Sequence, residues 1–142
     1  MRVAIVEDSE QFKFFLNMIF QEQNWEPIFF SSGEDFDSES FDVIIIDYRL
    51  PGEDGEIVLA YIEKNCKRPH YAIMAADSEM IGPDKIQPAL YCNLFEKEDI
   101  KTMIQWLQGI DNRLKVRELM EETRVLLEST QRMLPRIYLN LN

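Results

Sequence analysis

The sequence has few of the features that mark disulfide-stabilised, secreted or membrane-spanning proteins. Its 142 residues include only two cysteines, Cys66 and Cys92, without the C-x-x-C spacing of redox and zinc motifs, so we expect reduced thiols. No apolar run approaches the ~20 residues that a membrane-spanning helix needs. The chain opens directly on an apolar run, residues 2–6, which predicts a strand and leaves no room for a signal peptide. A cytoplasmic location is therefore expected.

Basic residues are also scarce relative to acidic ones. The chain has 15 Lys and Arg against 26 Asp and Glu, which gives a formal net charge of −11. Nucleic-acid binding requires a basic face that contacts phosphates, so this balance argues against it. The excess of carboxylates suits a pocket that attracts a cation, although most surface charge in a protein simply faces solvent.

Apolar residues, in contrast, make up 46% of the chain, which is long enough to bury one core. Five short apolar runs predict strands. The third has four β-branched residues in succession, a continuous run typical of a strand buried on both faces of a parallel sheet. The predicted strands are residues 2–6, 25–30, 43–47, 71–74 and 91–95.

Helical patterns alternate with these strands. Residues 10–23 place apolar side chains at helical spacing after Ser9, the expected N-cap. Residues 56–65 predict a second amphipathic helix, whereas residues 34–40 leave room for only one or two turns. This alternation predicts an α/β fold in which a doubly wound, five-stranded parallel sheet carries helices on both faces and occupies residues 1–108.

The last part of the chain predicts a long helix, with residues 109–134 as an extension beyond the sheet domain. Apolar and β-branched residues recur there at alternating steps of three and four, the heptad spacing of a coiled coil. They are Val116, Leu119, Thr123, Leu126, Thr130 and Met133. A parallel partner helix, and hence a homodimer, is the favoured interpretation, and the alternative is a helix folded back on its own domain. Pro135 is expected to end the helix and leave residues 135–142 as a flexible tail.

Charged side chains follow three of the predicted strands. Glu7 and Asp8 follow the first, Asp47 ends the third, and Lys97 follows the fifth. In a doubly wound parallel sheet these strand ends lie along one edge. Three carboxylates in one cleft repel one another unless a cation is present, and Mg²⁺ requires only one or two carboxylates plus water. A carboxylate beside Mg²⁺ and a lysine is suited to attack phosphorus and form an acyl phosphate.

Taken together, these residues resemble the receiver domains of response regulators in bacterial two-component signalling. The likeness covers residues 1 to about 108, includes the stretch LPGEDG at residues 50–55, and implies a flavodoxin-like receiver fold. It also implies that Asp47 is the phosphoacceptor, taking its phosphoryl group from a histidine kinase or a phosphotransfer protein. The metal site would then hold Mg²⁺ and Lys97 would contact the phosphoryl group. The implied metal ligands are Glu7, Asp8, Asp47 and the main-chain carbonyl of Arg49.

Both positions of the hydroxyl–aromatic relay of this family depart from its pattern, and Glu98 replaces the proline that usually follows the lysine. The usual Ser or Thr after the fourth strand is Ala75, which cannot donate a hydrogen bond to a phosphoryl oxygen, and the usual aromatic residue of the fifth strand is Leu94. Two functions therefore stay open. One is a phospho-accepting receiver whose output runs through the C-terminal helix, and the other is a phosphorylation-independent pseudo-receiver that acts as a protein–protein interaction module.

An enzyme acting on a separate substrate is not expected. Phosphatases of the haloacid-dehalogenase type require a second aspartate two positions after the nucleophile, where this chain has Arg49. Only self-phosphorylation and self-dephosphorylation are anticipated. Residues 128–135 are nevertheless similar to the junction that precedes some metal-dependent serine/threonine phosphatase domains in bacterial regulators. That likeness suggests a phosphatase-type effector as downstream partner, and the alternative is that the helix itself is the output.

Overall fold

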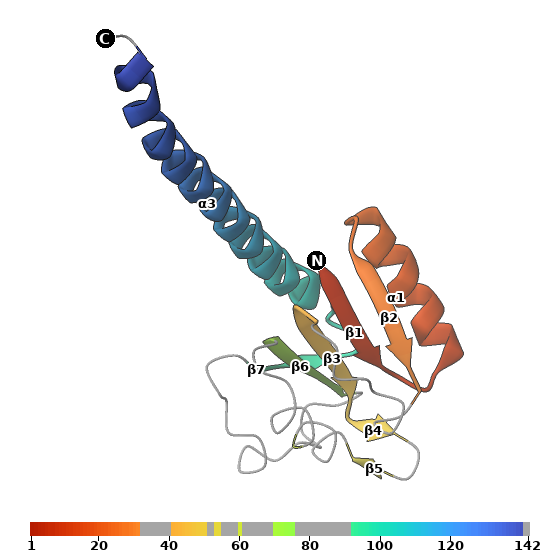
Figure 1. Ribbon diagram of the computed structural model, residues 1–142. Helices are drawn as coiled ribbons and strands as arrows, with labels where there is room; N and C mark the ends of the chain where they lie inside the picture. Colours follow the sequence, from red (N-terminus) through yellow and green to blue (C-terminus); the bar gives the residue numbers. More distant parts are fainter. Residues whose placement is uncertain (32–40, 51–52, 55–59, 61–69, 76–91, 141–142) are drawn as a thin grey trace. The chain divides into compact units, whose positions relative to one another are not determined.

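The computed structural model describes residues 1–31, 41–50, 53–54, 60, 70–75 and 92–140 of the chain (Figure 1). These residues belong to two compact units, Met1–Met103 and Ile104–Asn142. The helix predicted at residues 34–40 lies outside the described residues, and so does the helix predicted at residues 56–65 apart from residue 60. Within the described ranges, no helix is long and apolar enough to cross a membrane.

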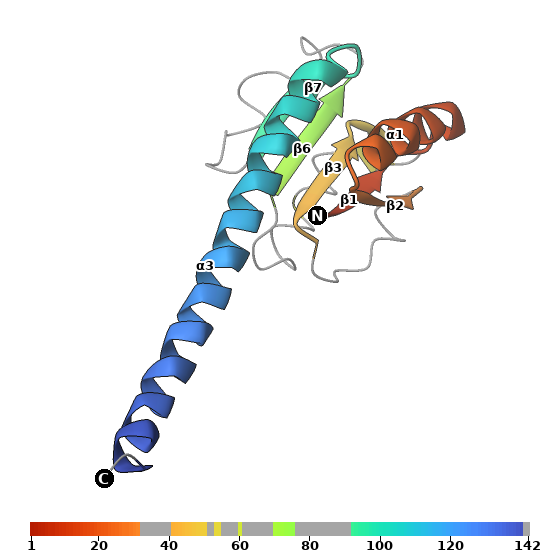
Figure 2. The same cartoon turned by 90° about the horizontal axis from the view of Figure 1, so that it is seen from above.

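The first unit is built on a sheet of five parallel strands. The strands are β1 (Arg2–Val6), β2 (Glu26–Phe30), β3 (Val43–Asp47), β6 (His70–Ala75) and β7 (Cys92–Glu96). Their order in the sheet is β2-β1-β3-β6-β7, with every neighbouring pair parallel (Figure 1 and Figure 2). The order reverses between β1 and β3, so the switch point of this doubly wound sheet lies at the carboxyl ends of these two strands. The predicted fold is confirmed.

The two central strands form the middle of the core. All four residues of each of the runs 3–6 and 43–46 are fully buried, and the two runs pair in register from Val3–Val43 to Val6–Ile46. Their Val and Ile side chains suit a pleated surface that is covered on both faces. The uninterrupted β-branched run in the sequence therefore reflects burial on both sides.

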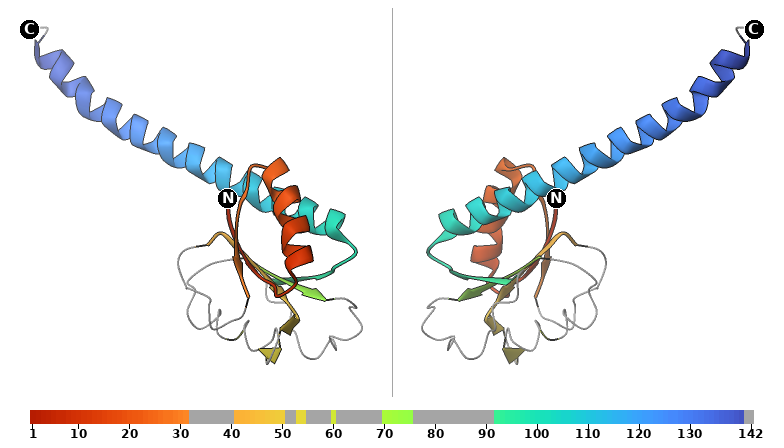
Figure 3. Two further views of the ribbon diagram at one scale, coloured as in Figure 1. Left: turned by 90° about the vertical axis from the view of Figure 1, so that its right-hand side faces the viewer. Right: turned by 90° about the vertical axis from the view of Figure 1, so that its left-hand side faces the viewer.

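One helix, α1 (Glu10–Glu22), follows β1 on one face of the sheet (Figure 3). Ser9 caps it as predicted, since its side chain accepts a hydrogen bond from the amide of Phe12. At the other end Asn24 adopts a left-handed conformation with φ 56°, and the amides of Asn24 and Trp25 return to the carbonyls of Gln21 and Phe20. This is a Schellman ending.

An aromatic contact supports that ending. The rings of Phe20 and Trp25 meet edge to face with centroids 5.5 Å apart, and both residues are buried. An apolar contact between these two positions commonly accompanies a Schellman motif. It fixes the point at which the chain leaves α1 and enters β2, one residue after the predicted start of the strand.

A short antiparallel ladder follows β3. In it, β4 (Arg49–Leu50) pairs with β5 (Glu53–Asp54). Leu50 is buried in a cluster with side chains of the two central strands, namely Ala4, Val6, Ile44 and Ile46. The segment after Asp47 is thus fastened to the core.

The final helix, α3 (Ile100–Asn140), has 41 residues. Asp99 accepts a hydrogen bond from the amide of Thr102 at its start, and Met103, Leu107 and Ile110 are fully buried. The helix continues through Pro135, so the prediction that the helix ends there and leaves a flexible tail is wrong up to Asn140. Proline removes one backbone hydrogen bond, but its fixed φ of about −65° is itself helical, and so a helix that is well formed on its N-terminal side can pass it.

Candidate functional site

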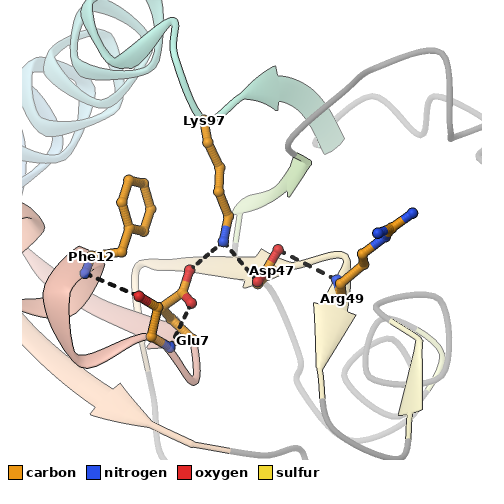
Figure 4. Close-up of polar contacts among 6 residues, drawn as sticks. Glu7, Phe12, Asp47, Arg49 and Lys97 are labelled. Atoms are coloured by element: carbon orange, nitrogen blue, oxygen red, sulfur yellow. Dashed lines mark hydrogen bonds and ion pairs between the residues drawn. The ribbon is translucent and has the colours of Figure 1, made fainter.

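The ends of three strands place the predicted site residues together. Asp47 is the last residue of β3, Glu7 follows β1 directly, and Lys97 follows β7 directly. Because β1 and β3 are neighbours in the sheet, Glu7 and Asp47 emerge side by side at its carboxyl edge (Figure 4). Both carboxylates are buried, with 0% of Glu7 and 4% of Asp47 exposed.

Lys97 joins the two buried carboxylates. Its ammonium nitrogen lies 2.8 Å from Oε2 of Glu7 and 2.7 Å from Oδ2 of Asp47. The remaining carboxylate oxygens accept from backbone amides: the amide of Ser9 donates to Glu7 Oε1 at 2.8 Å, and the amide of Arg49 donates to Asp47 Oδ1 at 3.3 Å. Each oxygen of the two buried acids therefore has a donor, which orients both side chains toward the strand ends.

Burial and hydrogen bonding shift the pKa values of Glu7 and Lys97. Burial raises the pKa of Glu7 above its ordinary value, and the neighbouring charge of Asp47 adds to this effect, although the hydrogen bonds from Lys97 and Ser9 oppose it. For Lys97, burial alone would lower the pKa, but its hydrogen bonds with Asp47 and Glu7 prevail and raise it. Lys97 is therefore a fixed cation at the sheet edge.

A third carboxylate, that of Asp8, completes an acidic cluster. Ligand oxygens of Glu7, Asp8 and Asp47 all lie within 4.8 Å of one another, and Asp8 is exposed to solvent. The ammonium of Lys97 offsets one of the three negative charges, so a divalent cation would offset the other two. Carboxylate oxygens with access to water are the donors that Mg²⁺ prefers, and the residues present therefore fit this ion. Arg49 is held next to Asp47 by its amide, and the metal-binding role of its carbonyl stays a prediction.

The structure adds one residue that the sequence did not single out. The ring of Phe12, in the first turn of α1, lies with its centroid 4.9 Å from the ammonium nitrogen of Lys97, a cation–π contact (Figure 4). In the sequence Phe12 is one of several apolar residues at helical spacing, which predicts only a core position. Its place next to Lys97 depends on a contact between the start of α1 and the end of β7.

The two relay positions that depart from the family pattern lie on β6 and β7. Met74 pairs with Asp47 in the sheet, and Ala75 is the next residue along β6, at the same carboxyl edge. Leu94 pairs with Ile73 on the neighbouring strand and is 38% exposed. The backbone register thus brings the alanine to the level of the acidic cluster, where it offers no hydroxyl group.

Comparisons with known proteins place this geometry among known folds. The sequence matches no protein-family model and no curated protein. The response regulator protein TrrA from Thermotoga maritima, solved in complex with Mg²⁺-BeF, superposes with a TM-score of 0.64 at 20% identity, covering 77% of this chain and 97% of that one. A CheY-like response regulator receiver domain from Methylobacillus flagellatus gives a TM-score of 0.65 at 18% identity, covering 78% and 98%.

A further solved structure extends this set. It is described as an adenylate cyclase from Rhodopirellula baltica and superposes with a TM-score of 0.54 at 20% identity, covering 84% of this chain and 96% of that one. At identities this low, the likeness of the three structures shows the fold. The chain has the CheY-like receiver fold.

Proposed function

We propose that this chain, which has the receiver fold, is a signalling receiver that accepts a phosphoryl group on Asp47. The donor would be a phosphohistidine of a sensor histidine kinase or of a phosphotransfer protein. The observation that carries the proposal is the position of the Lys97 ammonium, within 2.8 Å of both Glu7 and Asp47. A fixed cation next to a buried aspartate, at the edge where a sheet presents its ligands, is the arrangement that phosphoryl transfer to a carboxylate needs.

The transfer replaces one bond to phosphorus by another. A carboxylate oxygen of Asp47 forms a P–O bond while the P–N bond to the donor imidazole breaks, and the imidazole nitrogen keeps the electron pair of that bond and takes up a proton. Lys97 would move from the carboxylates to the phosphoryl oxygens, where its charge counts most in the transition state. Glu7, Asp8, Asp47 and the Arg49 carbonyl would hold Mg²⁺, which when bound supplies further positive charge to these oxygens.

We assign the output to the helical unit that follows the sheet. α3 carries exposed apolar side chains over several turns, which gives it a surface to offer a partner. A phosphatase-type effector downstream of residue 135 stays a prediction from the sequence. Turnover of a separate substrate is not part of the proposed function.

Incubation with Mg²⁺ and a small phosphoryl donor, acetyl phosphate or phosphoramidate, tests the proposal. Intact-protein mass spectrometry should show the addition of one phosphoryl group, lost in Asp47→Asn and without Mg²⁺. Asp42→Asn is a matched control, because Asp42 lies just before β3 and the amide oxygen can still accept the hydrogen bond that Asp42 receives from the Arg2 amide. Addition of the group to Asp47→Asn would contradict the assignment of the phosphoacceptor.

The pseudo-receiver is the second candidate, and one observation favours it. The residue of β6 at the level of the acidic cluster is Ala75, so a phosphoryl group on Asp47 would lack the hydroxyl donor that a Ser or Thr offers. If neither small donor nor a phosphorylated phosphotransfer protein modifies the chain, while the metal-free protein is fully folded, the pseudo-receiver replaces the first proposal.

A further inference from the structure

The helical unit presents a continuous apolar surface, which we call the stripe. It consists of Val116, Leu119, Thr123, Leu126, Thr130 and Met133, flanked by Met120 and Leu127. The six larger apolar side chains among them, all but the two threonines, are between 54% and 69% exposed. A helix that is stable in water ordinarily covers such a face, so the stripe requires an occupant.

The two threonines of the stripe need no polar partner. Thr123 Oγ1 donates to the carbonyl of Leu119 at 2.8 Å, and Thr130 Oγ1 donates to the carbonyl of Leu126 at 2.9 Å. Because their hydroxyl groups are satisfied within the helix, their methyl groups can be buried without leaving an unpaired polar atom. In packing terms Thr123 and Thr130 act as β-branched residues like Val116.

The residue types at the two core positions of the heptads indicate how many helices pack together and in which direction. The first core position of successive heptads holds Val116, Thr123 and Thr130, all β-branched, and the second holds Leu119, Leu126 and Met133. β-branched residues at the first position with leucine at the second favour two parallel strands over larger assemblies. The pattern therefore points to a partner helix with the same spacing, which a second copy supplies.

Three charged residues of the same turns pair with one another. Arg124 contacts Glu121 at 2.6 Å and Glu128 at 2.7 Å, all within one helix. None of the three belongs to the stripe, so its core positions carry no charge that would need an opposite charge on the partner. An apolar, uncharged occupant is what this face accepts.

The area of the stripe sets the strength of the pairing. Covering its large side chains in two helices removes on the order of 1,000 Å² of apolar surface, slightly less than the ~1,200–2,000 Å² of a standard stable interface. We propose that residues 116–133 pair with the same residues of a second copy as a parallel two-stranded coiled coil of modest, concentration-dependent stability. The pairing itself does not depend on the proposed function, because its contacts do not involve Asp47. Only the suggestion that pairing is the output of the receiver rests on that function.

Sedimentation velocity of the full chain over a wide range of concentrations tests the pairing. The mass should rise from one copy to two. Leu126→Glu should weaken self-association about tenfold or more, because it buries a carboxylate twice in each dimer. Gln131→Glu adds the same charge at an exposed position off the stripe and should dimerise normally. Glutamate forms helices well, so circular dichroism should show equal helix content in both variants when each is diluted until it is monomeric.

The direction of the helices needs its own measurement. In a parallel pair Val116 of one copy lies beside Val116 of the other, so Val116→Cys should form an intermolecular disulfide on mild oxidation while Gln131→Cys and the unchanged chain do not. A chain that stays monomeric at high concentration, a larger assembly, or a dimer in which Val116→Cys fails to cross-link would each overturn the proposal. Dimerisation of Asp47→Asn separates the two proposals, because the coiled coil should form in it even though phosphorylation cannot.

Discussion

At the scale of single residues, Glu7 is a buried acid with a raised pKa. Its folded-state pKa lies above the ordinary value of 4.5, chiefly because it is buried. The folded chain therefore binds this proton more tightly than the unfolded chain does. The resulting contribution to the free energy of unfolding is fully present below pH 4.5 and is lost as the pH rises through the raised pKa.

Glu7→Gln mimics the protonated acid at every pH. We therefore expect the free energy of unfolding of Glu7→Gln to increase relative to that of the unchanged chain as the pH rises. In metal-free buffer containing a chelator, urea unfolding at a series of pH values should show the stability difference between the two proteins shifting in favour of Glu7→Gln above pH 4.5 and then levelling. If the difference in unfolding free energy between the two proteins does not change with pH, then Glu7 has the same pKa in the folded and the unfolded chain and this prediction is wrong.

The same scale shows where sequence reasoning succeeds. The sequence predicts that Glu7, Asp47 and Lys97 lie close together, because each is at a strand end and the order of a parallel sheet determines which strand ends are neighbours. The sequence does not predict that Phe12 lies at the site, because its spacing on α1 is that of any core residue and its contact with Lys97 arises from tertiary packing. Site residues marked by topology are therefore predictable, and those that only support them are not.

At the scale of elements, the strands and α1 follow the sequence closely, whereas the end of α3 does not. Short apolar runs rich in Val and Ile located β1 and β3 to the residue, because strands buried on both faces of a parallel sheet favour such runs. The two-residue ladder of β4 and β5 is too short to have a period, and it was not predicted. α3 continues past Pro135, because a proline removes one hydrogen bond but its fixed φ remains helical.

The Schellman ending of α1 makes a prediction at this scale. Asn24 has φ 56°, a conformation that glycine adopts freely and that costs other residues roughly 1–2 kcal/mol. Asn24→Ala should therefore destabilise the fold by about 1 kcal/mol, whereas Asn24→Gly should leave the stability nearly unchanged or raise it. Gln23→Ala is the matched control, since Gln23 has φ −91° and alanine fits there. Equal destabilisation by Asn24→Ala and Asn24→Gly in chemical denaturation would mean that the asparagine side chain, and not the backbone conformation, matters.

At the scale of the whole molecule, the question is whether the acidic cluster of the first unit and the stripe of the second influence each other. The cluster has the charges to hold Mg²⁺ and a phosphoryl group, and the stripe has the pattern to pair. The two positions where the resemblance to receiver domains leads us to expect a relay of a hydroxyl and an aromatic side chain hold Ala75 and Leu94. A coupling between the cluster and the stripe is therefore best tested without assuming that relay.

Thermodynamic linkage makes this coupling measurable without knowing its route. If a phosphoryl mimic at Asp47 tightens pairing of the stripe, pairing must tighten binding of the mimic. Because each dimer binds two mimics, the affinity of each site rises by the square root of the factor by which pairing tightens. We expect beryllofluoride with Mg²⁺ to lower the dimer dissociation constant about fivefold or more, the lower end of typical allosteric couplings, as measured by sedimentation equilibrium. Asp47→Asn should abolish the change. Leu126→Glu, at concentrations where it is monomeric, should bind beryllofluoride more weakly by the square root of that factor, because the dimer has two sites. A dimer equally tight with and without the mimic would make the coiled coil a constitutive scaffold and remove it from the output of the receiver.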